Sequence, residues 1–91
     1  MAGEHILIVE DEEDIAELLE YNLGRQGYEA EAVGTGEDGL QLAREAMPDL
    51  VLLDLMLPKL SGIDVCRALK ADAETARIPV IMLTAKGEEE D

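Results

Sequence analysis

Ninety-one residues suffice for one small domain, in which nearly every element must pack against the core. Hydrophobic residues make up 47% of the chain, as is typical of a folded protein, and seven basic against 22 acidic residues leave a net charge of −15. This charge argues against direct binding of nucleic acid or of an anionic membrane surface, because both are themselves negatively charged.

Compartment and membrane association are predicted from further features of the composition. The single cysteine, Cys66, cannot form an internal disulfide, and no export signal is visible at the N-terminus. No apolar run approaches the roughly 20 residues that a membrane-spanning helix needs. We therefore expect a cytoplasmic chain without membrane contact.

In chain order, the first predicted element is a strand of four apolar residues at 6–9. Residues 13–26 have the spacing of an amphipathic helix, with acidic residues in the first turn and Arg25 and Gly27 at the end. We expect one side of this helix to consist of Ile15, Leu18, Leu19, Asn22 and Leu23. Residues 28–33 alternate between glutamates and apolar residues, which predicts a half-exposed edge strand.

The remaining elements complete an alternating order of strands and helices. Thr35 with Asp38, and Ser61 with Asp64, have the spacing of capping boxes, which predicts helices at about 36–46 and 62–71. The apolar runs at 50–53 and 80–83, like that at 6–9, predict strands buried on both faces. Right-handed crossovers between parallel strands then predict a doubly wound α/β fold with helices on both faces of the sheet.

Acidic residues directly follow two of the buried strands. Glu10 and Asp11 follow the first, Asp54 follows the run at 50–53, and the hydroxyl of Thr84 follows the run at 80–83. Ligands of open parallel sheets bind beyond the carboxyl ends of the strands, so these side chains should meet at one edge. Carboxylates so close need a counter-charge, and a set made only of oxygen ligands favours Mg²⁺.

Each of these residues also has a purely structural interpretation. Glu10 and Asp11 could be an acidic helix start, which stabilises the macrodipole by about 0.3–1 kcal/mol per group. Asp54 could cap the loop before Pro58, and Thr84 could be an ordinary hydroxyl at a strand end. Their arrival together from three strands favours the metal site.

Four segments give the sequence a resemblance to a known family. They are Ile-Val-Glu-Asp-Glu at 8–12, Leu-Asp-Leu-Met-Leu-Pro at 53–58, Ser-Gly at 61–62 and Ile-Pro-Val-Ile-Met-Leu-Thr-Ala at 78–85. In order and spacing they resemble the receiver domains of two-component response regulators, and the similarity covers the whole chain. The acidic pair, the turn at 54–58 and the residues at 84–91 are most similar to the winged-helix class, of the phosphate-regulon type.

The resemblance implies a flavodoxin-like receiver fold and a role for each matching residue. Asp54 would accept a phosphoryl group from a sensor histidine kinase, and Thr84 would be the switch hydroxyl. Mg²⁺ would be bound by Glu10, Asp11, Asp54 and the backbone carbonyl of Met56. Such a protein is a switch rather than an enzyme, and its expected output is transcription, through a DNA-binding domain outside this chain.

The sequence also departs from the family pattern. Receivers usually continue with a fourth helix, a fifth strand that ends in a lysine, and a last helix, none of which is found in residues 1–91. Residues 1–91 are therefore expected to be the N-terminal part of a receiver domain. Without those elements, apolar surface left on the first helix and an open strand edge at 80–83 predict a homo-oligomer, with exchange of elements between protomers as one route.

Three alternatives stay open at this point. Residues 34–39 fit the dinucleotide-binding pattern G-x-G-x-x-G, although Glu37 and Asp38 would place negative charge beside a pyrophosphate. A phosphatase with an aspartyl nucleophile would also use Asp and Mg²⁺ at a strand end, but Met56 occupies the place of its usual second acid. An interaction module that cannot be phosphorylated is the third, because the fifth-strand lysine is missing.

Overall fold

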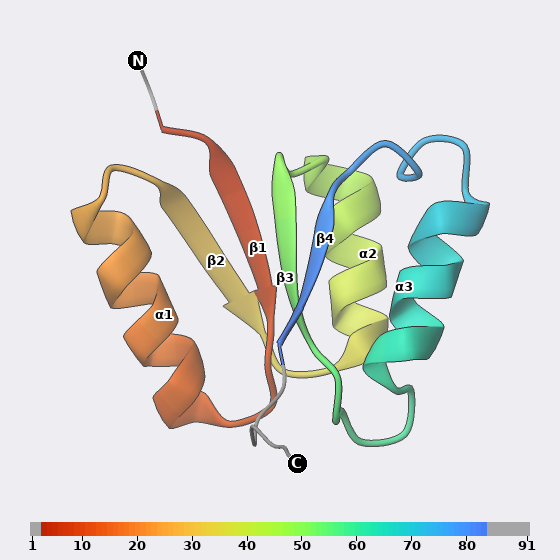
Figure 1. Ribbon diagram of the computed structural model, residues 1–91, viewed down its shortest axis with the longest axis horizontal. Helices are drawn as coiled ribbons and strands as arrows, with labels where there is room; N and C mark the ends of the chain where they lie inside the picture. Colours follow the sequence, from red (N-terminus) through yellow and green to blue (C-terminus); the bar gives the residue numbers. More distant parts are fainter. Residues whose placement is uncertain (1–2, 84–91) are drawn as a thin grey trace, which may run out of the picture.

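The computed structural model describes residues 3–83, which form a parallel sheet between helices (Figure 1). The strands are β1 (His5–Val9), β2 (Glu29–Val33), β3 (Leu50–Asp54) and β4 (Val80–Leu83), and their spatial order is β2-β1-β3-β4. All three strand pairs are parallel. The predicted doubly wound α/β fold, with β2 as an edge strand, is thereby confirmed.

Three helices connect the strands: α1 (Glu13–Arg25), α2 (Gly36–Ala46) and α3 (Gly62–Ala71). The capping residues explain why α2 and α3 begin where the sequence predicts. Thr35 Oγ1 accepts a hydrogen bond from the Asp38 amide at 3.1 Å, and Ser61 Oγ accepts one from the Asp64 amide at 3.2 Å. No helix in residues 3–83 is long and apolar enough to cross a membrane.

The two faces of the sheet have separate hydrophobic clusters. Alternate strand residues such as Leu7, Val51 and Leu53 point toward α2 and α3, whose Ala43, Val65 and Leu69 complete that cluster. On the other face Ile6, Ile8 and Leu52 are buried, and α1 covers them with the half-buried Leu19 and Leu23. Cys66 is half-buried against the first cluster, as expected of a core residue.

Two residues of the predicted apolar side of α1 face solvent. Leu18 is 61% exposed, and Asn22 is exposed, with its side-chain amide donating to the Leu18 carbonyl at 2.8 Å. The helix packs on the sheet through the half-buried Leu19 and Leu23 of that side, and its Ala16 is buried. The exposed Leu18 is part of the apolar surface expected on this helix.

The prediction that every apolar run is buried on both faces was wrong for β4. Val80 and Met82 pack against the α2 and α3 cluster, but Ile81 is 51% exposed on the opposite face. β4 lies at the end of the strand order and, among the described residues, pairs only with β3. An edge position therefore explains its exposure.

Candidate metal centre

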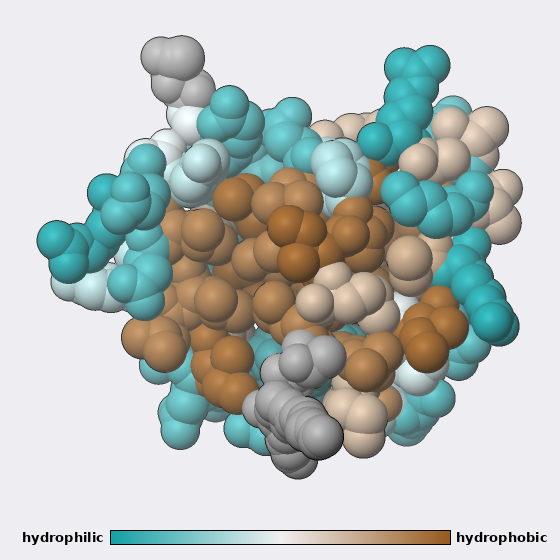
Figure 2. Space-filling model, viewed as in Figure 1, coloured by the Kyte–Doolittle hydropathy of each residue, from teal (hydrophilic) through white to brown (hydrophobic). Residues whose placement is uncertain are grey.

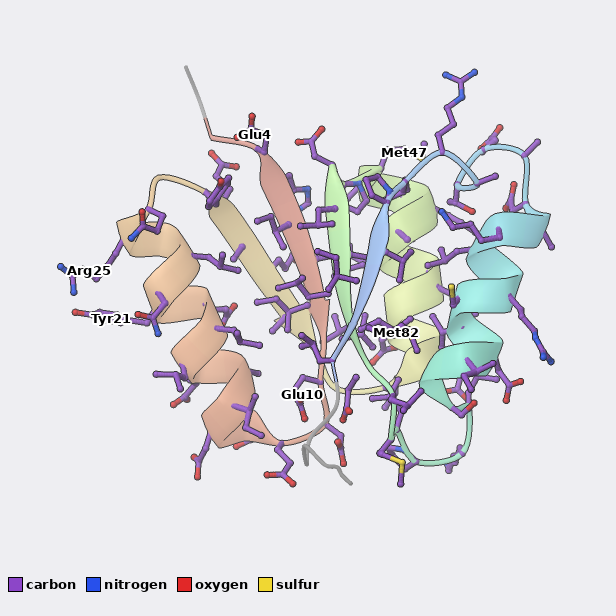
Figure 3. The ribbon with its side chains drawn as sticks, viewed as in Figure 1. Glu4, Glu10, Tyr21, Arg25, Met47 and Met82 are labelled. Atoms are coloured by element: carbon purple, nitrogen blue, oxygen red, sulfur yellow. The ribbon has the colours of Figure 1, made fainter. Side chains whose placement is uncertain are left out.

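Three carboxylates meet at the carboxyl ends of β1 and β3. The two strands are in register, with Val9 beside Leu53, so Glu10 and Asp54 follow at the same level of the sheet. Ligand oxygens of Glu10, Asp11 and Asp54 all lie within 4.8 Å of one another. Figure 3 shows Glu10 at the end of β1, at the same edge of the sheet to which all four strands point. The predicted meeting of these three residues is thus found in the structure.

Backbone amides hold the two buried carboxylates. The Glu12 amide donates to Glu10 Oε2 at 3.1 Å, and the Met56 amide donates to Asp54 Oδ1 at 3.0 Å. Glu10 is only 6% exposed and Asp54 only 3%, whereas Asp11 is exposed. Two fixed carboxylates and one solvent-facing carboxylate therefore form the cluster.

The electrostatics of the cluster favour a bound cation. Burial raises the pKa of the Glu10 carboxyl, the hydrogen bond from the Glu12 amide opposes this, and the neighbouring charges of Asp54 and Asp11 raise it further. Within residues 3–83, the contacts between basic and acidic side chains join His5 to Glu31 and Arg44 to Asp72, away from the cluster. A cation would supply the positive charge that these contacts do not.

The donor set also fits the expected metal. All its side-chain ligands are carboxylate oxygens, which hard divalent cations such as Mg²⁺ prefer over nitrogen or sulfur. A groove of about 280 Å³ between α1 and β2 opens beside the cluster and includes three more glutamates of α1. These glutamates are Glu13, Glu17 and Glu20. Their negative potential attracts cations toward the site.

The other two predicted site residues are Met56 and Thr84, which do not contribute carboxylates. Met56 follows Asp54 by two residues, its side chain is 69% exposed, and its amide contact keeps its backbone beside the Asp54 carboxylate. Thr84 lies outside the described residues, so its predicted role stays a prediction.

Two glycines of the dinucleotide-like pattern serve packing. A Cβ atom at Gly36 would lie 2.7 Å from Val65 Cγ2, and one at Gly39 would lie 2.8 Å from Val9 Cγ2. Both contacts are with side chains of the α2 and α3 cluster. The glycines therefore let α2 approach its neighbours closely, so packing accounts for both of them.

Gly62 belongs to the Ser-Gly segment of the family resemblance, but no role was predicted for it; it lies against the loop after β3. The Gly62 amide donates to the Leu55 carbonyl at 3.1 Å, and the residue is buried. The available signal was a glycine in the first turn of a helix, directly after the capping Ser61, where glycine disfavours helix formation.

Comparison with known proteins identifies the family. The sequence matches the response regulator receiver domain over residues 6–91. The chain belongs to this family. The receiver is 48% identical over 86 residues to the phosphate regulon transcriptional regulatory protein PhoB of Rhizobium meliloti (strain 1021), covering 94% of this chain and 38% of the relative. It is 50% identical over 86 residues to the alkaline phosphatase synthesis transcriptional regulatory protein PhoP of Bacillus subtilis (strain 168), covering 94% of this chain and 35% of the relative.

These relatives confirm the predicted resemblance to winged-helix regulators of the phosphate-regulon type. The receiver spans little more than a third of their length, 38% and 35%. Among solved structures, it resembles the N-terminal domain of a response regulator receiver protein from Methanoculleus marisnigri JR1. That match has a TM-score of 0.89 and 38% identity, over 93% of this chain and 69% of the other.

A second solved structure was determined with a metal. It is the receiver domain of the sensor histidine kinase PA1611 from Pseudomonas aeruginosa PAO1, with a magnesium ion coordinated in its active site cleft. The TM-score is 0.88 and the identity 34%, over 93% of this chain and 70% of that one. Both structures share the fold described above.

Proposed function

We propose that Asp54 accepts a phosphoryl group from a sensor histidine kinase in a Mg²⁺-dependent reaction. Glu10, Asp11, Asp54 and the backbone carbonyl of Met56 would bind the metal, and Thr84 would be the switch hydroxyl. The observation that carries the proposal is the approach of three carboxylates, from two strand ends, to within 4.8 Å of one another. The magnesium-bound relative supports the choice of metal.

The described contacts suit Asp54 to act as the nucleophile. Its Oδ1 accepts a hydrogen bond from the Met56 amide, which orients the carboxylate, and its second oxygen, Oδ2, would be the attacking atom. That oxygen would form the O–P bond while the P–N bond of the phosphohistidine breaks. When bound, Mg²⁺ offsets the repulsion between the negatively charged carboxylate and the negatively charged phosphoryl group. Glu10, held by the Glu12 amide, would keep that cation in place.

The proposed output is control of transcription. The new phosphoryl group adds charge and strong acceptor oxygens, which would draw in the Thr84 hydroxyl and shift the neighbouring loop. Both curated relatives are transcriptional regulators more than twice as long as this chain, since it spans 38% and 35% of them. DNA binding would therefore belong to a domain outside these 91 residues.

Intact mass after incubation with acetyl phosphate and Mg²⁺ tests the proposal. We expect the wild type to gain one phosphoryl group, and Asp54→Asn to gain none. Asp49→Asn is the matched control, because Asp49 precedes the opposite end of the same strand and an asparagine can still accept the His5 amide. It should be labelled like the wild type.

Other outcomes of this experiment distinguish the alternatives. Binding of Mg²⁺ without labelling would favour an interaction module that is not phosphorylated. Rapid turnover of a small phosphate ester would favour a phosphatase. Labelling that survives Asp54→Asn would contradict Asp54 as the acceptor.

We also propose that the 91-residue chain associates with a second copy through the β4 edge and the adjoining apolar face. Ile81 is 51% exposed there, and a groove of about 340 Å³ on the same face is lined by residues including Ile6, Leu50 and Leu52. Figure 2 shows apolar side chains gathered over the strands at the centre of this view. Two β4 edges can pair around a twofold axis without either chain giving up an element, a simpler route than exchange.

Charge gives this association a specific signature. Each chain carries a net charge of −15, so two copies repel one another until salt screens them. We expect light scattering to show a mass that rises toward two chains as salt increases. A mass of one chain at high concentration and high salt would contradict the proposal.

A further inference from the structure

We infer that Gly62 is a positioning residue for the metal site: its missing side chain lets the start of α3 lie against the backbone of Asp54 and Leu55. This inference rests on the proposed function, since it concerns the same carboxylate. It assigns to a residue of the third helix a part in setting where the acceptor oxygen lies.

The contact between Gly62 and the acceptor strand is unusually close. A Cβ atom at position 62 would lie 2.3 Å from the Asp54 carbonyl oxygen, 2.8 Å from Leu55 Cα and 3.0 Å from the Asp54 carbonyl carbon. All three atoms belong to backbone, which cannot swing aside as a flexible side chain can. Any side chain at position 62 must therefore displace the peptide that joins Asp54 to Leu55, the start of α3, or both.

That peptide is directly connected to the proposed ligands. The Asp54 carboxylate projects from one end of it, and its Oδ1 accepts the amide of Met56, whose carbonyl is a proposed ligand. The Leu55 carbonyl in turn accepts the Gly62 amide at 3.1 Å, which ties the loop to the helix. A displacement at Gly62 would consequently reach the carboxylate and the Met56 backbone together.

The need for glycine here is a need for space. Gly62 lies in the first turn of α3 and does not have a positive φ, so alanine could adopt its backbone conformation. Alanine would also favour the helix over glycine. What excludes a side chain is therefore the neighbouring backbone of the site.

Gly36 provides a matched comparison within the same chain. It is also buried, begins a helix and follows a capping residue, Thr35. A Cβ atom at Gly36 would meet Val65 Cγ2 at 2.7 Å and the Leu60 carbonyl oxygen at 3.1 Å. Alanine at either position disturbs packing, but only at position 62 does the clash fall on the acceptor strand.

The experiment compares Gly62→Ala with Gly36→Ala and the wild type. Thermal unfolding gives the folded fraction, calorimetric titration gives Mg²⁺ affinity, and acetyl phosphate labelling gives the rate per folded molecule. We expect Gly62→Ala to lose about tenfold or more in Mg²⁺ affinity, the scale of effect of residues that orient metal ligands. Gly36→Ala should lower stability and leave the affinity close to that of the wild type.

A measurement on the wild type covers the case in which Gly62→Ala does not fold. If the Gly62 contact and metal binding are coupled, Mg²⁺ must strengthen the contact as much as the contact strengthens Mg²⁺ binding. Hydrogen exchange of the Gly62 amide should therefore slow on addition of Mg²⁺ by more than that of the Asp38 amide, which bonds Thr35 at the start of α2.

The possible results separate this inference from the proposed function. A wild type that neither binds Mg²⁺ nor is labelled would contradict the proposed function itself. A wild type that does both, alongside a folded Gly62→Ala with unchanged affinity and labelling, would overturn only the role of Gly62. Equal slowing of the two amides by Mg²⁺ would overturn it as well.

Discussion

The two faces of the sheet are built from the same strands but are covered very differently. Toward α2 and α3, nine buried apolar residues form one cluster, whereas the cluster toward α1 contains three buried residues, Ile6, Ile8 and Leu52. Alternation along a strand supplies apolar side chains to both faces, so the strands themselves do not create this difference. The number and position of the covering helices create it. Burial in this fold is thus decided by neighbours as much as by hydrophobicity.

The largest test of this comparison uses adjacent leucines of β3. Leu53 is completely buried in the α2 and α3 cluster, and Leu52 is 9% exposed on the α1 face. We expect Leu53→Ala to lower the free energy of unfolding by about 3–5 kcal/mol and Leu52→Ala by about 2 kcal/mol. The smaller loss is expected because residues around a less tightly enclosed side chain can move in to fill the cavity. Urea unfolding measures both. Equal losses would mean that the faces are equally well packed.

A pair of helical glycines gives the next largest effect. A Cβ atom at Gly39 of α2 would lie 2.8 Å from Val9 Cγ2, whereas one at Gly24 of α1 would meet nothing within 4 Å. Gly39→Ala should cost about 1–3 kcal/mol through overpacking. Gly24→Ala should gain about 0.5–1 kcal/mol from helix propensity alone. Opposite shifts of the melting temperature are the expected result, and shifts of the same sign would contradict it.

Helix capping should distinguish α2 from α1 by a smaller amount. Thr35 caps α2 through its hydroxyl, while Glu12 at the start of α1 makes no side-chain capping bond. Thr35→Ala should therefore cost about 1 kcal/mol, with Thr35→Ser close to the wild type. Glu12→Ala should change the free energy of unfolding little, because its backbone amide still donates to Glu10. Chemical denaturation of the three variants would show whether the caps differ as the structure indicates.

The smallest expected effect on stability is at Ile81, which lies in β4 on the sheet face that α1 covers. Ile81→Thr keeps a β-branched residue in an edge strand at a position that is 51% exposed. The free energy of unfolding should therefore change by no more than about 0.5 kcal/mol. The effect of the substitution should appear in association instead. At high salt the variant should have a lower average mass than the wild type by light scattering. An unchanged mass would remove Ile81 from the proposed contact.

Local signals in the sequence predicted most of the elements and the candidate site. Helices α2 and α3 span 36–46 and 62–71 as predicted, because Thr35 and Ser61 mark their starts chemically. The carboxylates of Glu10, Asp11 and Asp54 meet as expected, because parallel strands in register deliver the residues that follow them to one edge. Such features depend on chain order and strand direction, both of which can be inferred from the sequence.

Other features were decided only when the elements packed together. Helical periodicity placed Leu18 and Leu19 on the same side of α1, and packing covered Leu19 but left Leu18 61% exposed. The apolar run of β4 resembled that of β1, yet Ile81 is 51% exposed whereas Ile8, at the same level of the sheet, is buried.

The close approach of Gly62 to the backbone of Asp54 likewise joins two elements across a loop. By itself, the sequence determined which elements form and which residues follow the strands, because capping and alternation act over a few neighbouring residues. Tertiary structure alone decided which apolar side chains are covered and which glycine must stay small, because those depend on atoms that are brought together only by packing.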